Sequence, residues 1–191
     1  MLSTDDDTVL TYTQRADGQA DHEFTTFADS KPVEYRLYRH GETSQPPGCV
    51  VAAEVEFDGP NPERQRRWVD TVLDVMATET EPIPGGISGY FHVSTDGTRA
   101  FDYAEWTSEQ AHRDALARSA DQGVIGTSSE WRRVQEFPGV KAGGFKRYHP
   151  PRTLTAPADG STPVDSPTDW VASHVRAYVE TDGRDGHLYQ G

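Results

Sequence analysis

The stretch ISGYFHVSTDGTRAFDYAEW, residues 87–106, decides the fold that the sequence predicts. Apolar and polar residues alternate on both sides of Asp96-Gly97, and this dipeptide between alternating runs is a strong signal for a β-hairpin. We therefore predict two antiparallel strands, over residues 87–95 and 98–106, joined by a two-residue turn.

A two-residue turn also fixes which residues of the two strands lie opposite each other. On one face of the sheet the expected pairs are Thr95 with Thr98, Val93 with Ala100, Phe91 with Asp102, Gly89 with Ala104, and Ile87 with Trp106. The other face then carries amphipathic aromatic side chains, those of Tyr90, His92, Phe101 and Tyr103. Such side chains suit an interface between two sheets, so a second copy of the chain is expected to cover this face.

Two strands and a helix are predicted ahead of the hairpin. Residues 33–39 and 49–57 alternate in polarity as half-buried strands do. Asn61 suits the N-cap of a helix and Pro62 suits its first position. From there to Met76 the apolar residues recur on one helical face, which predicts an amphipathic helix.

A helix and a final strand are predicted after the hairpin. Thr107 and Gln110 have the spacing of a capping box, and the helix that it starts is expected to end near Ser119. A short helical piece over 131–137 and a strand over 145–154 follow. The core order β-α-β-β-α-β predicts a ferredoxin-like α+β fold, with two helices on one face of a mostly antiparallel sheet.

Charge and composition divide the chain into three parts. The net charge is −13, from 31 acidic and 18 basic residues, which argues against binding to nucleic acid or to an anionic membrane surface. We predict a disordered acidic segment over 1–32, a folded domain over 33–154, and a linker followed by an amphipathic C-terminal helix over 155–191. The strand over 33–39 is then an extra strand ahead of the core.

Other sequence features indicate which cofactors the protein is expected to lack and in which cellular compartment it is expected to occur. Cys49 is the one cysteine, so neither an intrachain disulfide nor a cysteine zinc site is expected. The sequence has no HExxH, GxGxxG or P-loop motif, so we expect no metal and no nucleotide cofactor. The acidic N-terminus is unlike a signal peptide, and no apolar run is long enough to span a membrane, so we expect a cytoplasmic protein.

The predicted hairpin register indicates a pocket. Gly89 and Ala104 lie opposite each other and fill little volume, whereas Ile87, Phe91 and Trp106 surround them, so a ligand is expected to occupy the space. Asp102 points into the same region, where burial would raise its pKa and suit it to acid or base catalysis. The alternative is that Asp102 pairs with an arginine such as Arg113 and that a bulky helix side chain fills the gap.

Residues from about 50 to 148 resemble the antibiotic biosynthesis monooxygenase domain. The resemblance is carried by VVAAEVEF (50–57), RQRRWVDTVLDVM (64–76), PGGISGYFHVSTDG (84–97) and FDYAEWTSEQAHRDAL (101–116). It implies a homodimer whose two sheets pack into an α+β barrel, with a pocket between sheet and helices in each subunit. It also implies oxidation of phenolic polyketides to quinones by O₂, without flavin, metal or haem.

The resemblance assigns candidate site residues, and at two positions this chain departs from the family's pattern. The family's tryptophan corresponds to Trp106, but its asparagine four positions earlier is Asp102 here. A tyrosine that some members place on the next helix corresponds to His112. The two departures suggest an acid–base pair that shares a proton near neutral pH; the alternative is that His112 lies on an exposed helix face. The haem-degrading branch has a histidine ligand where this chain has Leu116, which disfavours haem.

These observations lead to one hypothesis and two alternatives. The first is a cofactor-independent monooxygenase that oxidises a polycyclic phenol, with Asp102, Trp106 and His112 catalytic. In it, the substrate-binding residues would be Ile87, Gly89, Phe91 and Ala104. The second is a polyketide cyclase or aromatase that uses the same pocket without oxygen. The third is a non-catalytic dimer that binds an aromatic ligand.

Overall fold

The computed structural model describes residues 1–5, 8–15, 33–41, 45–119, 126, 128–150 and 174–181. Its strands are β1 (Thr8–Arg15), β2 (Val33–His40), β3 (Cys49–Phe57), β4 (Gly86–Ser94), β5 (Arg99–Trp106), β6 (Val140–Tyr148) and β7 (His174–Thr181). Its helices are α1 (Pro62–Met76), α2 (Glu109–Arg118), the short 3₁₀ helix η1 (Ser129–Trp131) and α3 (Arg132–Gln135). Within these ranges, no helix is long and apolar enough to cross a membrane.

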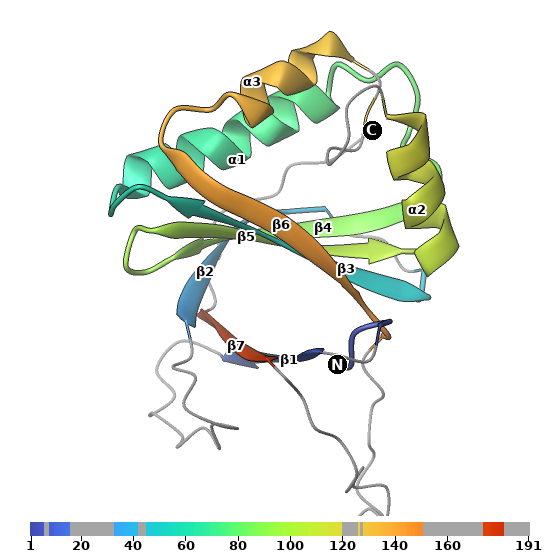
Figure 1. Cartoon of the computed structure of the whole chain (residues 1–191), viewed down its shortest axis with the longest axis horizontal. Coiled ribbons are helices and arrows are strands. Elements are labelled where there is room, and N and C mark those ends of the chain that lie inside the picture. Colours follow the sequence, from blue (N-terminus) through green and yellow to red (C-terminus); the bar gives the residue numbers. More distant parts are fainter. Residues whose placement is uncertain are drawn as a thin grey trace, which may run out of the picture.

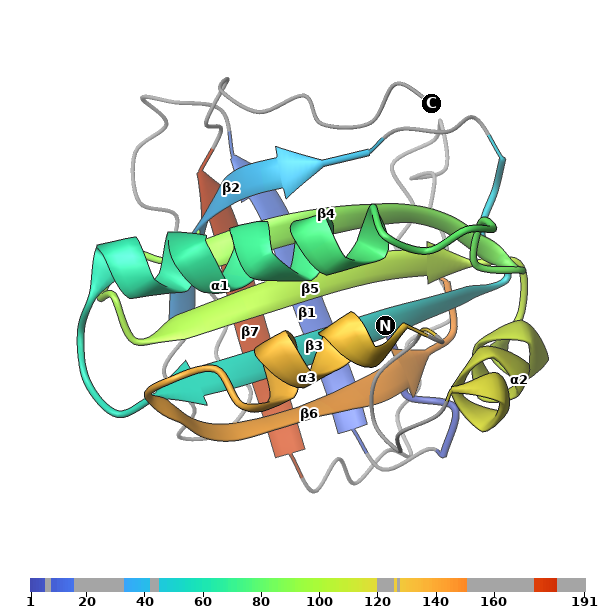
Figure 2. The same ribbon diagram turned by 90° about the horizontal axis from the view of Figure 1, so that it is seen from above.

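The central strands and helices confirm the predicted ferredoxin-like α+β fold. Along the chain they follow the order β3, α1, β4, β5, α2, β6. In the sheet the strands lie in the order β4-β5-β3-β6, and each is antiparallel to its neighbours. Helices α1 and α3 lie over one part of one sheet face, and α2 lies at its far end (Figure 1, Figure 2). Strand β2 pairs antiparallel with β4 as the predicted extra strand.

The register predicted for the hairpin is confirmed along its middle. Gly89 pairs with Ala104, and Phe91 pairs with Asp102. At the turn, Gly97 has a φ of +78°, a conformation that glycine adopts without strain. The paired residues therefore place the side chains of β5 on the two sheet faces as the sequence predicts.

The hairpin differs from the prediction at both ends. The pair of Thr95 and Thr98 is absent from the ladder, because the Ser94 hydroxyl accepts the Thr98 amide at 3.2 Å and the Arg99 amide at 2.9 Å. At the other end a β-bulge between Gly86 and Ser88 shifts the pairing by one residue. Gly86, rather than Ile87, is therefore opposite Trp106.

The first helix is confirmed with its predicted cap. The Asn61 side chain accepts the Arg64 amide at 3.0 Å, and Pro62 is the first helical residue. The apolar face of α1 packs with α3 and η1 on the sheet in one large buried cluster. That cluster consists of Phe57, Val69, Val72, Leu73, Val75, Phe91, Val93, Ala100, Trp131, Val134 and Phe137.

The second helix begins one residue later than predicted. Ser108, not Thr107, is the N-cap, because its side chain accepts the Ala111 amide at 3.1 Å. The helix ends at Arg118, and Ser119 is its C-cap. Its start is fixed directly after β5, so residues on its first turns lie near the end of that strand.

Within the chain, terminal segments pack on the opposite face of the central sheet, the face that a second copy was expected to cover. Strands β1 and β7 pair in parallel and cross beneath the central strands (Figure 1, Figure 2). Leu10 is fully buried in a cluster with Tyr35, Val50, Ala52, Phe101, Tyr103 and Tyr148. The predicted aromatic face therefore exists, but its apolar area is removed from water within one chain.

Three predictions about the ends need correction. Strand β1 lies in the segment predicted to be disordered, and β7 replaces part of the predicted C-terminal helix, whose beginning lies outside the described residues. Strand β6 begins at Val140, five residues earlier than the predicted strand, and ends at Tyr148, ahead of the two prolines. Both terminal strands are stabilised by partners that are distant in sequence, because β7 pairs with β1 and with β2.

Candidate active site

The helix-facing side of β5 carries three of the predicted site residues. Asp102, Ala104 and Trp106 alternate along the strand and so share a face, because side chains two apart point the same way. Ala104 lies between Gly89 of β4 and Val51 of β3 in the sheet. Gly89, Asp102 and Ala104 all keep partial exposure, so side chains do not cover this floor completely.

Asp102 is a carboxylic acid in an apolar setting. Its Oδ1 atom is inaccessible to solvent and has no hydrogen-bond partner, although the residue as a whole is partly exposed. Burial raises the pKa of Asp102 to about 7, and a backbone hydrogen bond from Tyr90 acts weakly in the opposite direction. At neutral pH the group therefore exists in both protonation states, which is the condition for accepting and returning a proton.

The alternative partner for Asp102 is excluded. The guanidinium of Arg113 instead bonds the carboxylate of Glu109 within α2, through Nε at 2.9 Å and through Nη2. A Cβ atom built on Gly89 would lie 3.5 Å from Asp102 Oδ1, so the carboxyl group lies directly beside the glycine. The Phe91 ring lies as close to the same position, with Cε2 at 3.4 Å, so Gly89 contacts both the acid and this ring.

Trp106 and His112 form the end of the site nearest α2. Trp106 is 5% exposed and packs in a cluster with Cys49, Val51 and Ala115. The rings of Trp106 and His112 meet edge to face, with centroids 4.8 Å apart. The proximity of the two residues follows from the short connection between β5 and α2.

His112 is buried and neutral. It is 1% exposed, so the alternative that His112 lies on an exposed helix face is wrong. Its Nδ1 atom accepts a hydrogen bond from Nε of Arg147 at 2.8 Å. Burial, reinforced by the positive charges of Arg147 and Arg113, lowers the pKa of His112 to about 4.

These contacts argue against proton exchange between His112 and Asp102. The lone pair of Nδ1 is engaged by Arg147, so the proton of the neutral ring resides on Nε2. No hydrogen bond joins the described side chains of Asp102 and His112. Asp102 alone of the two has the pKa and the unoccupied oxygen that a general base needs.

Strand β6 contributes two residues that the sequence analysis missed. Phe145 pairs with Ala53, and Arg147 pairs with Val51, so both lie on the helix-facing side. The Arg147 guanidinium lies 5.1 Å from the centre of the Phe145 ring, and that ring lies 5.1 Å from the ring of His112. Phe145 is a large exposed hydrophobic side chain, at 38% exposure. The alternation of Phe145 and Arg147 along the last predicted strand was the available signal.

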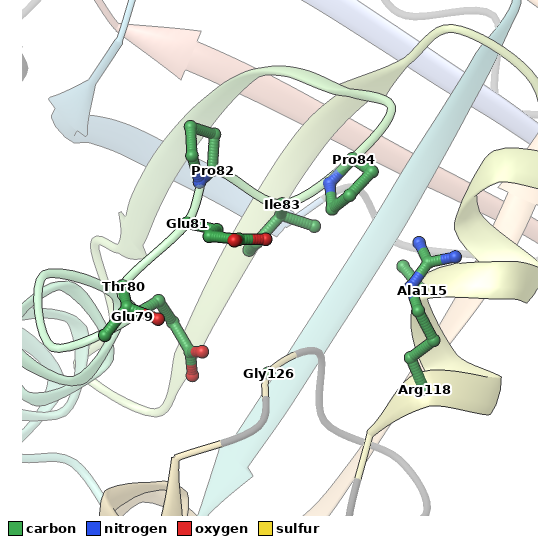
Figure 3. Close-up of a pocket in the computed structure, with 9 residues that line it drawn as sticks. All are labelled: Glu79, Thr80, Glu81, Pro82, Ile83, Pro84, Ala115, Arg118 and Gly126. Carbon is green, nitrogen blue, oxygen red and sulfur yellow. The ribbon is translucent and has the colours of Figure 1, made fainter.

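A pocket of about 190 Å³ adjoins this cluster (Figure 3). Its lining residues come from the connection between α1 and β4, from α2 and from Gly126: Glu79, Thr80, Glu81, Pro82, Ile83, Pro84, Ala115, Arg118 and Gly126. Ile83 and Ala115 also pack in the Trp106 cluster. The pocket is therefore next to Trp106, whereas Asp102 is not among its lining residues.

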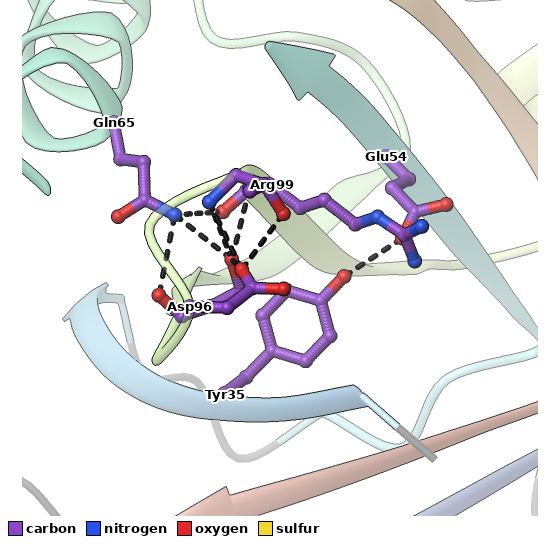
Figure 4. Close-up of polar contacts among 7 residues, drawn as sticks. Tyr35, Glu54, Gln65, Asp96 and Arg99 are labelled. Carbon is purple, nitrogen blue, oxygen red and sulfur yellow. Dashed lines mark hydrogen bonds and ion pairs between the residues drawn. The ribbon is translucent and has the colours of Figure 1, made fainter. Parts of the chain in front are cut away.

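A second polar cluster, at the hairpin turn, is structural (Figure 4). Gln65 of α1 donates to the Ser94 hydroxyl at 2.9 Å and to the Arg99 carbonyl at 2.6 Å. On the other side of the sheet Tyr35 donates to Glu54 at 2.7 Å. The hydrogen bonds that Gln65 makes fix the helix to the turn, so they do not indicate a ligand site. Elsewhere in the described ranges, no three His, Cys, Asp or Glu side chains converge as metal ligands.

Comparison with known proteins adds a sequence relative. No protein-family model matches the chain. Over 59 residues it is 38% identical to tetracenomycin-F1 monooxygenase of Streptomyces glaucescens, a match that covers 31% of this chain and 53% of that protein. The chain thus spans about half the length of this curated relative. The predicted resemblance to antibiotic biosynthesis monooxygenases is confirmed over the matched stretch.

Solved structures give weaker likenesses. A monooxygenase of Streptomyces coelicolor, from the gene ActVA-Orf6 and in complex with nanaomycin D, is 28% identical, with a TM-score of 0.42 over 59% of this chain and 94% of that one. A ferredoxin-fold protein of Listeria monocytogenes related to antibiotic biosynthesis monooxygenases is 14% identical, with a TM-score of 0.43 over 62% of this chain and 64% of that one. Both TM-scores are below 0.5, so neither likeness carries functional weight.

Proposed function

We propose that the protein is a monooxygenase that oxidises a polycyclic phenol of the aromatic polyketide type with O₂, giving a quinone. The observation that carries this proposal is the buried carboxyl group of Asp102, which has an unpartnered oxygen and lies beside Gly89. The 38% identity to tetracenomycin-F1 monooxygenase supports the reaction class. The proposed reaction uses no flavin, haem or metal.

Asp102 would act as the general base. As carboxylate it accepts the phenolic proton, and a pKa of about 7 lets it do so near neutral pH and return the proton later. The phenolate gives one electron to O₂, and the resulting aryloxyl radical and superoxide, after taking up a proton, combine at a ring carbon as a hydroperoxide. Loss of water from this hydroperoxide converts a ring methylene to a carbonyl. One oxygen atom thus enters the product, and the other leaves as water.

The remaining residues would bind the flat substrate. Gly89 and Ala104 would provide a floor with no long side chains, and the Phe91 and Trp106 side chains, which are 6% and 5% exposed, would flank it. Ile87 was expected in this set, but the bulge removes it from the position opposite Trp106. Keeping water from the phenolate and peroxide would protect them from side reactions.

Oxygen uptake by metal-stripped protein tests the proposal. With anthrone as the phenol-forming substrate, we expect consumption of one O₂ per anthraquinone formed, and one ¹⁸O atom from ¹⁸O₂ in the product. Asp102→Asn should remove the activity while leaving the far-ultraviolet circular dichroism unchanged. Absence of uptake with anthrone and with naphthacenone-type phenols would contradict the proposal. Product formation under strict anaerobiosis would indicate the cyclase alternative instead.

A further inference from the structure

The sheet of this chain closes on itself. Its strand order, β1-β7-β2-β4-β5-β3-β6, leaves β1 and β6 as the two outer strands. A short N-terminal segment joins these two strands: Ser3 forms an antiparallel bridge with Tyr148 of β6, and Leu2 forms one with Val9 of β1. Backbone pairing therefore runs all the way round, as it does in a barrel, and one chain supplies every strand.

Hydrogen bonds hold the closure on both sides. The Thr4 amide donates to the Arg147 carbonyl at 2.9 Å, and the His149 amide donates to the Leu2 carbonyl at 2.9 Å. On the other side β7 lies between β1 and β2 and pairs in parallel with both (Figure 1). The terminal strands are thus joined to the central sheet at β2 and at β6, so backbone pairing sets their position beneath it.

The closure buries the aromatic face of the central sheet. Leu10 of β1 packs in a cluster with side chains from β2, β3, β5 and β6. The members of this cluster that are at most 2% exposed are Leu10, Tyr35, Val50, Phe101 and Tyr148. An interface between two permanently associated chains needs an apolar core that each chain exposes when it is alone. Here the side chains that would form such a core are already removed from water.

Polar groups on the same face also have partners within the chain. The Tyr35 hydroxyl donates to the Glu54 carboxylate at 2.7 Å, and Nη1 of Arg99 lies 3.7 Å from the same carboxylate. The Ser88 hydroxyl donates to Glu105 at 2.5 Å. These acidic groups therefore need no second chain to supply a donor or a counter-charge.

The apolar surface that remains lies elsewhere. Among the described residues, the large hydrophobic side chain that is exposed is that of Phe145, at 38% exposure. It lies on the helix-facing side of β6. Single exposed hydrophobic side chains are normal on monomeric proteins, whereas a dimer interface needs a continuous patch.

We infer that the protein is a monomer, in which the N-terminal segment, β1 and β7 take the place that a second copy was expected to occupy. The barrel that would need two sheets from two chains is completed by the two ends of one chain. Each molecule then carries one complete candidate site, and no residue of that site comes from a partner. The oligomeric state does not depend on the proposed function, so the two are tested separately.

Sedimentation equilibrium of the full-length protein tests the inference directly. Measurements would run from about 1 to about 100 μM, a range over which mass action reveals a dimer of ordinary affinity. We expect one species of 21.2 kDa throughout. A species of twice that mass would overturn the inference, including a dimer in which two chains exchange their terminal strands.

A matched pair of variants tests whether β1 covers the face. Leu10 is fully buried, whereas its neighbour Val9 is partly exposed, and side chains of adjacent strand residues point to opposite sides. Leu10→Asp places a charge in the cluster, so we expect a lower urea midpoint and a rise in the fluorescence of a dye that binds exposed apolar surface, 8-anilinonaphthalene-1-sulfonate. Val9→Asp adds the same charge and should change both quantities less.

Each outcome decides the question. Equal urea midpoints and equal dye fluorescence in the two variants would show that β1 does not cover the aromatic face, and would overturn the inference. A larger change in Leu10→Asp, together with the monomer mass of the wild type, supports it. If circular dichroism shows that Leu10→Asp does not fold, Leu10→Ala is compared with Val9→Ala by the same two measurements and the same criterion.

Discussion

The helix-facing side of the central sheet has two regions of opposite character. Under α1 and α3 the sheet is covered by large apolar side chains that pack in one buried cluster. Toward α2 the strands carry Gly89 and Ala104 together with Asp102 and Arg147, and α2 itself adds His112. Strand β5 belongs to both regions, with Ala100 in the packed part and Ala104 in the open part.

The difference teaches that side chains at one end of this face serve stability, whereas those at the other end are the ones that we propose act in catalysis. Side chains that fill the space under α1 gain free energy by leaving water and by close contact. A buried carboxyl group with an unpartnered oxygen lowers stability instead. Such a cost is typical of a functional site, where a perturbed pKa is of use.

The largest expected effect is the loss of turnover in Asp102→Asn. Removal of a general base lowers kcat by about 10²- to 10⁴-fold. Because asparagine has nearly the same volume, KM for the phenol should change much less. Steady-state oxygen uptake measures both constants, and a variant that keeps more than a tenth of the wild-type kcat would show that Asp102 is not the base.

Truncation in the packed region should affect stability rather than turnover. Phe57 is 2% exposed within the large cluster, so Phe57→Ala is expected to lower the free energy of unfolding by about 3–5 kcal/mol. At a temperature where the variant is folded, its kcat should stay near that of the wild type. Urea denaturation gives the stability, and a loss below about 1 kcal/mol would mean that this region is not tightly packed.

The pH dependence of stability should separate the two titratable groups. The pKa of Asp102 is raised from 3.8 to about 7, so the stability that its protonated form provides is lost as pH rises from about 4 to 7. The pKa of His112 is lowered from 6.5 to about 4, so the stability that its neutral form provides is lost as pH falls from about 6.5 to 4. Between pH 4 and 6.5 the two contributions oppose each other.

Asp102→Asn should therefore isolate the contribution of the aspartate to the pH dependence of stability. Relative to the wild type, its free energy of unfolding should be about equal at pH 4 and higher by about 4 kcal/mol at pH 8, as an order of magnitude for a shift of three pKa units. Urea titrations at a series of pH values measure this difference. A difference that did not grow with pH would contradict the raised pKa of Asp102.

The smallest expected effects come from the same substitution made in each of the two regions, and they compare the packing of the regions most directly. Ala100→Val adds two methyl groups where the residue is 1% exposed, and should cost about 1–3 kcal/mol. Ala104→Val adds the same groups at a partly exposed position of the same strand, and should cost less than about 1 kcal/mol while weakening ligand binding. If both substitutions cost the same, the open region would be as closely packed as the other.

The sequence predicted the features that depend on local pattern. The turn at Asp96-Gly97 set the register, and the register placed Asp102, Ala104 and Trp106 on one face. The cap at Asn61 and the apolar stripe after it defined α1. Each of these follows from residues within one turn or one hairpin.

The rest depended on contacts between distant segments. The bulge beside Ile87 reflects local pairing that alternation alone does not reveal. The bond between His112 and Arg147 joins residues 35 positions apart, so neither residue's role was evident from spacing. The terminal strands β1 and β7 lie near opposite ends of the sequence, so no local pattern indicates that they pair with each other.

A crystal structure with a flat tricyclic quinone, such as anthraquinone-2-carboxylate, tests the central claim most directly. We predict that the rings lie over Ala104 and Gly89, with one ring oxygen within hydrogen-bond reach, about 2.6–3.2 Å, of the Asp102 carboxyl group. A quinone bound on the other face of the sheet, or a complex in which this protein's own side chains fill the space beside Gly89, would contradict it.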